Sequence, residues 1–363
     1  MVQLHFNNLK AAEKAGHFGK GLEVSREINH LLEPKMERIR WRSYEKLTEF
    51  RVEIPEDQLD FYRNGSWPVR LTPDGKKLLI VNASKSFQIY DFETAQSRTT
   101  SIFTDRDETQ NNLGPCRLSV QNELFYLTAT DFDNGKRVVI YYDLYDPKFS
   151  GITRGGQLPH EFDTLDDEHT VGIYGNKIAK IGSGFMSSGE FRLPDQSVHI
   201  EKIKLSRDGR LVYALSKLFR LYVWDYKSEK FIQEPNFKIA QFVTLPNDRI
   251  ACIGWDHKIY LLENLRDSKS ESEPIPFDQT DNYVSIAADA EGKYLVAATV
   301  FNEAKVFELA TGKQIRKLPL PSDLLARESG FIRAVEITPD HTVVISLKDG
   351  RVLVYGKSKS VSQ

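Results

Sequence analysis

Residues 203–225 read IKLSRDGRLVYALSKLFRLYVWD, three short apolar runs separated by polar turns. The first run ends at Asp208-Gly209, the second spans Leu211–Leu215, and the third ends in the pair Trp224-Asp225. Runs rich in β-branched and aromatic residues, bounded by turn dipeptides such as Asp-Gly, are typical of antiparallel strands joined by tight turns. The stretch therefore predicts a small β-meander.

The same order of turns and strands returns along the chain. Gly75 lies 134 residues before Gly209, a span of three copies, and Gly292 lies 83 residues after it, a span of two. Both spans give the period of roughly 40–45 residues that is typical of a four-stranded repeat unit. Seven copies are present, marked by Val69, Cys116, Phe162, Ile203, Phe242, Ala290 and Val335.

A single four-stranded unit leaves apolar faces and strand edges in water, whereas radial stacking buries the faces and leaves only short edges. The copies resemble WD-repeat β-propellers through Val223-Trp224-Asp225 and the Asp-Gly turns before second strands. Only one third-strand run ends in a Trp-Asp pair, Trp224-Asp225, and no Gly-His dipeptide precedes a first strand. The resemblance implies structural roles for the WD-like residues Trp224, Asp225, Tyr90, Asp91 and Asp256.

The expected fold is all-β: a seven-bladed β-propeller over residues 37–357, with repeats from about residue 60. The seventh copy ends near Tyr355-Gly356, before a polar tail at 358–363, and it lacks an outer strand. We expect a strand within residues 38–54 to close the ring. Two stretches could form this strand, because every second residue alternates with a charged one. One stretch contains Ile39, Trp41 and Ser43, and the other contains Phe50, Val52 and Ile54.

Residues 1–36 are expected to form a short helical extension. Leu22, Ile28, Leu31 and Leu32 fall close to one helical face, and Pro34 is a stop signal. The extension either caps one propeller face or serves as a docking or dimerisation element. Both interpretations stay open at this stage.

Composition excludes several classes of protein. The 49 basic and 51 acidic residues give a net charge of −2, so there is no global basic field for nucleic acid. The basic stripe Arg38–Arg42 around Trp41 is diluted by acidic neighbours, which also disfavours nucleic acid. Two cysteines, Cys116 and Cys252, build no disulfide framework. No apolar stretch approaches a membrane span, so we expect a cytoplasmic protein, with the nucleus as the alternative.

Signatures of catalysis and of cofactor binding are missing from the sequence. It has no Gly-x-Ser-x-Gly elbow, no phosphate-binding glycine loop and no His-Glu-x-x-His helix. The densest group of imidazole and carboxylate side chains, within residues 160–169, lacks the glycine and the spacing of a calcium loop. We therefore expect no cofactor and no metal.

The remaining candidate site follows from the expected geometry. The loops that lead into the inner strands of a propeller gather around one mouth of the central channel. Scattered residues would converge there from six blades, and Trp67, Tyr283 and Arg333 are the strongest anchors because Trp, Tyr and Arg dominate interface hot spots. The predicted partner-binding residues are Trp67, His160, Glu201, Gln241, Tyr283 and Arg333.

The predicted function is a non-catalytic scaffold that binds a protein or peptide. One alternative is the substrate receptor of a cullin-type ubiquitin ligase, since such receptors often carry Trp-Asp-x-Arg, and this chain has Trp224-Asp225-Tyr226-Lys227. Lys and Arg are not equivalent at a forked hydrogen-bond site. Another alternative is a propeller enzyme, a hydrolase or lyase acting at the channel mouth. The fold alone does not decide between them.

Overall fold

The computed structural model describes residues 44–51, 69–72, 76–82, 86–94, 96–101, 117–121, 124–130, 137–143, 149–155, 158–159, 161–165, 168–182, 187–266, 274–325 and 332–357. These residues form seven four-stranded antiparallel sheets and one short helix, α4 (Ser322–Leu325). The fold of this part of the chain is therefore all-β.

Six sheets are built from consecutive strands. The first three are β2 (Val69–Leu71), β3 (Lys77–Asn82), β4 (Ser86–Asp91) and β5 (Gln96–Ser101); β6 (Arg117–Gln121), β7 (Leu124–Thr130), β8 (Arg137–Asp143) and β9 (Phe149–Gly155); and β10 (Glu161–Thr164), β11 (Thr170–Tyr174), β12 (Lys177–Ile181) and β13 (Ser187–Phe191).

The next three are β14 (Ile200–Leu205), β15 (Leu211–Ser216), β16 (Leu221–Asp225) and β17 (Phe231–Gln233); β18 (Ile239–Leu245), β19 (Arg249–Gly254), β20 (Ile259–Leu262) and β21 (Ile275–Asp278); and β22 (Tyr283–Ala288), β23 (Tyr294–Thr299), β24 (Ala304–Glu308) and β25 (Lys313–Lys317). The last sheet joins β26 (Ile332–Ile337), β27 (Val343–Leu347) and β28 (Arg351–Lys357) to β1 (Tyr44–Arg51).

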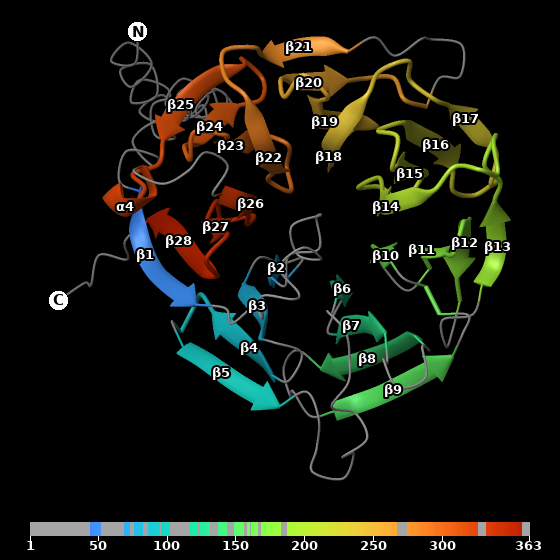
Figure 1. The fold of residues 1–363 in the computed structure, drawn as a ribbon, viewed down its shortest axis with the longest axis horizontal. Coiled ribbons are helices and arrows are strands. Elements are labelled where there is room, and N and C mark those ends of the chain that lie inside the picture. The colour runs from blue at the N-terminus through green and yellow to red at the C-terminus, as the bar shows by residue number, and fades with distance from the viewer. Residues whose placement is uncertain are drawn as a thin grey trace, which may run out of the picture.

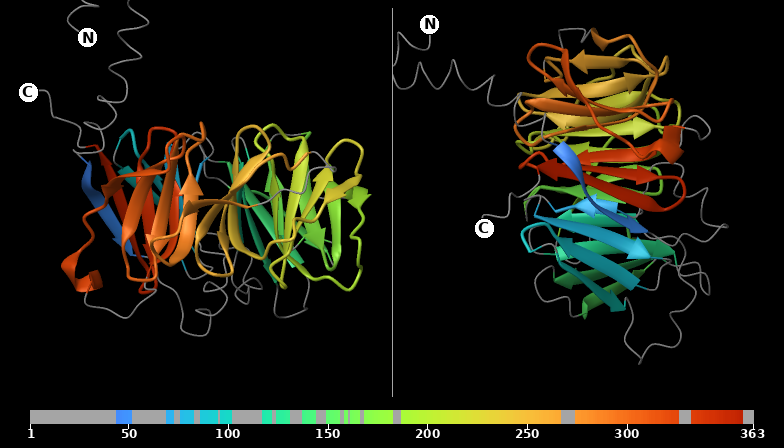
Figure 2. Two further views of the ribbon diagram at one scale, coloured as in Figure 1. Left: turned by 90° about the horizontal axis from the view of Figure 1, so that it is seen from above. Right: turned by 90° about the vertical axis from the view of Figure 1, so that its left-hand side faces the viewer.

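The sheets stand side by side around a ring in chain order (Figure 1). The first strand of each consecutive unit lies nearest the axis of the ring and the fourth lies at the rim. Seen from the side, the sheets form a disc about as thick as one strand is long (Figure 2). This is the arrangement of a β-propeller.

The ring is closed by the strand that comes first in the described chain. β1 pairs antiparallel with β28, from Tyr44 opposite Lys357 to Arg51 opposite Arg351. The closing strand was expected within residues 38–54, and it lies there. It was expected to be formed by one of two stretches of alternating apolar residues, Ile39–Ser43 or Phe50–Ile54. β1 instead spans the boundary between the two stretches, and a bulge between Lys46 and Thr48 interrupts its period.

Hydrophobic cores lie between neighbouring sheets. Val171, Ile173 and Phe191 of β11 and β13 pack with Ile203 and Trp224 of the following sheet. The same arrangement joins the last sheet to the first, where Val69 and Leu78 meet Val344 and Val352. In these described parts of the ring, neighbouring sheets bury their apolar faces against each other.

Trp224 lies in the third strand of its sheet, as predicted, and its side chain is 0% exposed. Its indole Nε1 donates to the carbonyl of Arg192 at 3.0 Å, and its ring meets that of Phe191 in the preceding sheet. The role of Trp224 is thus to join two sheets. Cys252 is also fully buried, and desolvation raises the pKa of its thiol well above its usual range.

Two predictions fall on residues outside the described ranges: the helical extension at 1–36 and the polar tail at 358–363. Within the described ranges, no helix is long and apolar enough to cross a membrane.

Candidate functional site

One face of the ring gathers the segments from which the site was predicted. On this side, which we call the front face, the inner strands begin and the second strand of each sheet turns into the third. It is turned toward the viewer in Figure 1 and carries α4 (Figure 2). Backbone hydrogen bonds join neighbouring sheets on this face. The amide of Ile239 donates to the carbonyl of Phe219, and the amide of Tyr283 donates to the carbonyl of His257, both at 2.8 Å. Ile239 and Tyr283 are the first residues of the next inner strands.

Four inner strands carry a β-bulge at the same place, directly after their first residue. In each, one residue is skipped by the pairing between first and second strand. Bulges re-aim a side chain and locally end the alternation of a strand. The skipped residues are Glu201, Ala240, Val284 and Arg333.

The predicted site residues are distributed unevenly over this geometry. Glu201 is exposed and Arg333 is half-buried, and both occupy the bulge position. Gln241 lies one residue beyond the bulge of its strand and is half-buried. Trp67 and His160 lie outside the described residues.

The prediction that Tyr283 binds a partner at the channel mouth does not agree with its burial. Its side chain is 0% exposed and packs edge to face on Phe307, so its ring is not available at the surface. Burial raises the pKa of its hydroxyl well above the usual range. Tyr283 does lie at the start of the inner strand, but its side chain packs in the core, and the bulge position after it holds the half-buried Val284.

Four turns between second and third strands share one geometry on the front face. In each, the first residue accepts a backbone hydrogen bond from the fourth, and the fourth has a positive φ of 62° to 84°. The four turns start at Ser216, Gly254, Thr299 and Leu347, and their fourth residues are Phe219, His257, Asn302 and Gly350. We call the third residue of each turn its tip.

The third position is occupied in two chemically different ways. Asp256 and Asp349 stand there in two turns, and their Oδ1 atoms accept the amides of Lys258 and Arg351, both at 3.1 Å. Leu218 and Phe301 stand there in the other two. An aspartate at this position supports the turn, whereas Leu and Phe cannot do so.

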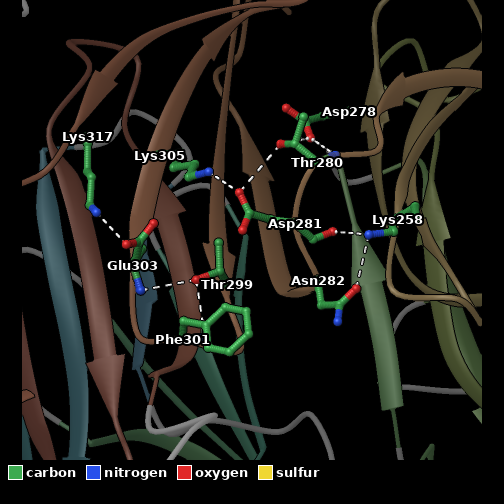
Figure 3. Close-up of polar contacts among 10 residues, drawn as sticks. All are labelled: Lys258, Asp278, Thr280, Asp281, Asn282, Thr299, Phe301, Glu303, Lys305 and Lys317. Carbon is green, nitrogen blue, oxygen red and sulfur yellow. Dashed lines mark hydrogen bonds and ion pairs between the residues drawn. The ribbon is translucent and has the colours of Figure 1, made fainter. Parts of the chain in front are cut away.

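The two turns without aspartate are held from their first residue instead. Ser216 Oγ accepts the amide of Arg220 at 3.2 Å, and Thr299 Oγ1 accepts the amides of Phe301 and Glu303, both at 3.2 Å. Figure 3 shows the Thr299 contacts. The hydrogen bonds that hold these two turns therefore do not come from the side chains of Leu218 and Phe301.

These tips are exposed to solvent. Leu218 is 64% exposed, Phe301 is 62% exposed, and Trp255, the second residue of the turn between them along the ring, is 59% exposed. The rings of Trp255 and Phe219 lie 4.4 Å apart at their centroids, across the boundary between two sheets. We call Leu218, Trp255 and Phe301 the turn-tip patch. It lies on three consecutive sheets.

The turn-tip patch was not predicted from the sequence, because the site was predicted only from the loops that lead into the inner strands. A signal was present. Aligning the four turns shows Leu218 and Phe301 where two copies carry Asp, a substitution that the turn itself does not require.

Ion pairs hold the loop before β22 beside this patch (Figure 3). The ammonium of Lys305, which is buried, pairs with the carboxylate of Asp281. Lys258 donates to the carbonyl of Asp281 at 2.9 Å and to Asn282 Oδ1 at 3.1 Å. Glu303, directly before the third strand of the same sheet, pairs with Lys317 at the end of the fourth strand. The front edge of this sheet is therefore fixed by charged side chains.

Charged side chains also meet between inner strands, near the axis of the ring. Asp163 accepts Lys204 Nζ at 2.6 Å and the amide of Leu205 at 2.8 Å. Glu336 accepts Arg70 Nη1 at 3.3 Å and the amide of Leu71 at 2.9 Å. Each carboxylate lies on one inner strand and binds the inner strand of the next described sheet.

Lys202 stands apart from these pairs. Its Nζ lies 5.6 Å from the centroid of the Phe242 ring, and it makes no hydrogen bond or ion pair with another described residue. Desolvation, with the nearby cations Lys204 and Arg70, lowers the pKa of this ammonium to about 7, although Asp163 acts the other way. Lys202 follows Glu201 at the front end of β14.

The other WD-like residues have structural partners. Asp91 and Asp225 close the turns after third strands, where Asp91 accepts the amides of Glu93 and Thr94 and Asp225 accepts that of Ser228. Desolvation opposes ionisation of Asp91, but its contacts with Lys77 and these amides lower its pKa to about 2. Tyr90 packs on Phe50 of the closing strand at 4.7 Å.

No group of three or more His, Cys, Asp or Glu side chains that could hold a metal ion occurs within the described ranges. The carboxylate of Asp163, from the acidic cluster considered in the sequence, is engaged by Lys204.

Comparison with solved structures identifies the fold as a WD-repeat-like β-propeller. The β-propeller domain of Cps50 (Swd1) from Myceliophteria thermophila is 16% identical, with a TM-score of 0.61, and the match covers 86% of this chain and 99% of that one. A chain of a mitotic checkpoint complex is 11% identical, with a TM-score of 0.62, and the match covers 86% of this chain and 91% of that one. No protein-family model and no curated protein matches the sequence.

Proposed function

We propose that this chain is a seven-bladed propeller that works as a non-catalytic scaffold, and that its front face binds a protein or peptide. The turn-tip patch carries the proposal. Large apolar side chains at 59–64% exposure on three consecutive turns cost solvation free energy, and the hydrogen bonds that hold the Leu218 and Phe301 turns come from Ser216 and Thr299. Clustered exposed apolar side chains rimmed by polar residues mark interaction sites.

The rigidity of the front face supports the same function. Each tip sits on a turn that is hydrogen-bonded internally, and two of the turns are also bonded to the next inner strand. Side chains held by a rigid scaffold lose little conformational entropy on binding, which favours affinity. Trp255 is the natural centre of such a surface, because Trp is enriched among interface hot spots.

The cullin-receptor alternative gains no support from the described residues. It rests on Trp224-Asp225-Tyr226-Lys227, and the side chains of Trp224 and Asp225 are engaged in joining two sheets and in closing a turn. Tyr226 donates its hydroxyl to the carbonyl of Glu168 in the preceding sheet. The enzyme alternative gains no support from a grouping of side chains within the described ranges either.

The test compares partner capture by the wild-type protein with capture by a Leu218→Asp/Phe301→Asp variant. Aspartate is the residue at the same turn position in two other sheets, so the fold is expected to survive. Ile275→Asp, which changes an apolar residue of 46% exposure on the rim strand β21, is the matched control.

We expect affinity purification with mass spectrometry to lose the main partners only for the double variant. The double variant must melt at the wild-type temperature for the comparison to count. Equal capture by all three proteins would overturn the front face as the recognition surface.

A further inference from the structure

The side of the ring opposite the front face, which we call the back face, carries the turns between first and second strands. In three of these turns the first residue accepts the amide of the fourth at 2.9–3.1 Å, and the fourth has a φ of 66° to 73°. The fourth residues are Gly209, Gly292 and His341. Such a φ is open to glycine but disfavoured for a residue with a Cβ atom. His341 therefore stands where the two equivalent turns carry glycine.

The imidazole of His341 contacts the preceding sheet. Its Nε2 lies 3.5 Å from Asp289 Oδ2, and its ring meets that of Tyr294 edge to face at 4.9 Å. Asp289 is 1% exposed, and its Oδ1 accepts the amides of Lys293 and Tyr294, both at 2.8 Å. Desolvation opposes ionisation of this carboxyl, but the His341 contact and the two amides outweigh it and lower the pKa of Asp289. Buried carboxylates need polar or charged partners, and His341 provides one at Oδ2.

Asp289 is also held from two sheets further back in the ring. Arg207, in the turn after β14, donates from Nη2 to the carbonyl of Asp289 at 2.9 Å and to that of Ala288 at 3.3 Å. Its Nε donates to the carbonyl of Thr244 at 3.0 Å. Thr244 lies in β18, Ala288 ends β22, and Asp289 follows it. One guanidinium therefore joins three consecutive sheets.

The closing strand is attached to the other end of this path. Tyr44, the first residue of β1, donates its hydroxyl to the carbonyl of His341 at 2.8 Å. Its side chain is 3% exposed and lies in the core that the last two sheets share. We call Tyr44, His341, Asp289 and Arg207 the back strap. It is a continuous series of polar contacts from the sheet of β14 to the closing strand.

We propose that the back strap is a latch that couples closure of the ring to the sheets of β14, β18 and β22. His341 carries a side chain at an unfavourable φ because its imidazole anchors, on Asp289, the turn whose carbonyl holds Tyr44. Loss of this anchor lets the turn move, and β1 is then released from the back face. The inference does not rest on the proposed function, because none of the four residues belongs to the front face.

The test follows hydrogen–deuterium exchange of β1 by mass spectrometry on the full chain. The reference strand is β11, which lies in a sheet that the back strap does not contact. A variant that only lowers global stability accelerates exchange in both strands alike, whereas release of the latch accelerates exchange in β1 alone.

The decisive variant is His341→Gly, because it separates the role of the imidazole from that of the backbone. Glycine relieves the unfavourable φ and is the residue of the two equivalent turns, so the turn should keep its shape. We nevertheless expect exchange of β1 to rise about fivefold or more relative to β11, as for loss of one buried polar contact.

Asn247→Gly is the matched control for the backbone. Asn247 has a φ of 62° and lies in the back-face turn between β18 and β19. It is exposed, and its side chain makes no hydrogen bond or ion pair with another described residue. This variant makes the same change in backbone freedom and should leave exchange of β1 unchanged.

Two further variants test the ends of the strap. Tyr44→Phe removes only a hydroxyl and should accelerate exchange of β1 about fivefold. Adding it to His341→Gly should change the rate little further, because both substitutions act on one series of contacts. Arg207→Gln should accelerate exchange of β1 about threefold or more. Its control is Arg210→Gln, the same charge change in the same turn at a side chain that is 60% exposed, which should have no effect on β1.

Three outcomes would overturn the latch. Exchange of β1 that is unchanged or slower in His341→Gly would mean that glycine is the better residue and that the imidazole has no role in closure. Equal acceleration of β1 and β11 would assign these residues to global stability. An effect of Arg207→Gln that is confined to β18 and β22 would remove the coupling. Partner capture by His341→Gly should equal that of the wild type, so the latch and the proposed function fail in different measurements.

Discussion

The hydroxyl of Tyr44 donates a hydrogen bond of 2.8 Å to the carbonyl oxygen of His341, 297 positions further along the chain. The same strand is paired along its length with β28. Phe50, near its other end, packs on Tyr90 in the first sheet of the ring at 4.7 Å. The closing strand thus contacts the sheets on both sides of the seam, and its removal exposes two apolar surfaces and one strand edge.

Deleting residues 1–55 should therefore make the protein aggregate, because β28 would become an unpaired edge. Deleting only residues 1–34 should leave solubility and the melting temperature unchanged, since β1 begins at Tyr44. Solubility after expression and thermal unfolding followed by circular dichroism measure both. A soluble 56–363 fragment that melts cooperatively would contradict the importance of β1.

Trp224→Ala should lower the free energy of unfolding by about 3–5 kcal/mol, as expected for truncation of a buried aromatic side chain. The side chain is 0% exposed and lies in the core between two sheets. Trp224→Phe should cost less, since it keeps a ring but leaves the Arg192 carbonyl without its donor. Urea titrations give both values, and an unchanged transition midpoint for the alanine variant would refute the packing argument.

Thr299→Ala should cost about 1–2 kcal/mol, because Thr299 Oγ1 is the acceptor that holds the Phe301 turn and is fully buried. Phe301→Asp should change stability by no more than about 0.5 kcal/mol, because the tip is exposed and does not support the turn. Chemical denaturation of the two variants tests this contrast. A larger loss for Phe301→Asp than for Thr299→Ala would mean that the tip stabilises the fold.

Much of the fold could be predicted from sequence, because each four-stranded unit is local and is marked by its own turns. The Asp208-Gly209 turn precedes β15, and the side chain of Trp224 is buried in a core, as the repeat pattern indicated. The limits of the closing strand could not be predicted, since the bulge between Lys46 and Thr48 breaks the alternation that would have marked them.

The site was harder to predict for a related reason. The bulge follows directly after the first residue of each of these inner strands, and Glu201 and Arg333 occupy it. Tyr283 is instead the first residue of its strand, and its side chain is buried. The turn-tip residues are separated by 37 and 46 positions in sequence, and only the ring brings them to one face.

The last prediction concerns the pH dependence of stability. In the folded protein the pKa of Lys202 is lowered from 10.5 to about 7, chiefly by desolvation. Between these two values the unfolded chain binds a proton that the folded chain does not, so this group makes stability rise with pH across that window. Below about pH 7 both states are protonated, and the full cost of the desolvated charge is present.

Lys202→Gln removes this contribution and introduces the residue that blade alignment places at the same position, Gln241, directly after the bulge of its strand. The variant should exceed the wild type in stability most at about pH 6–7, and the difference should shrink steadily toward about pH 10. Urea unfolding of both proteins across that range measures the difference. A difference that is constant with pH would mean that Lys202 titrates as in the unfolded chain, and that its ammonium is solvated at the front of the ring.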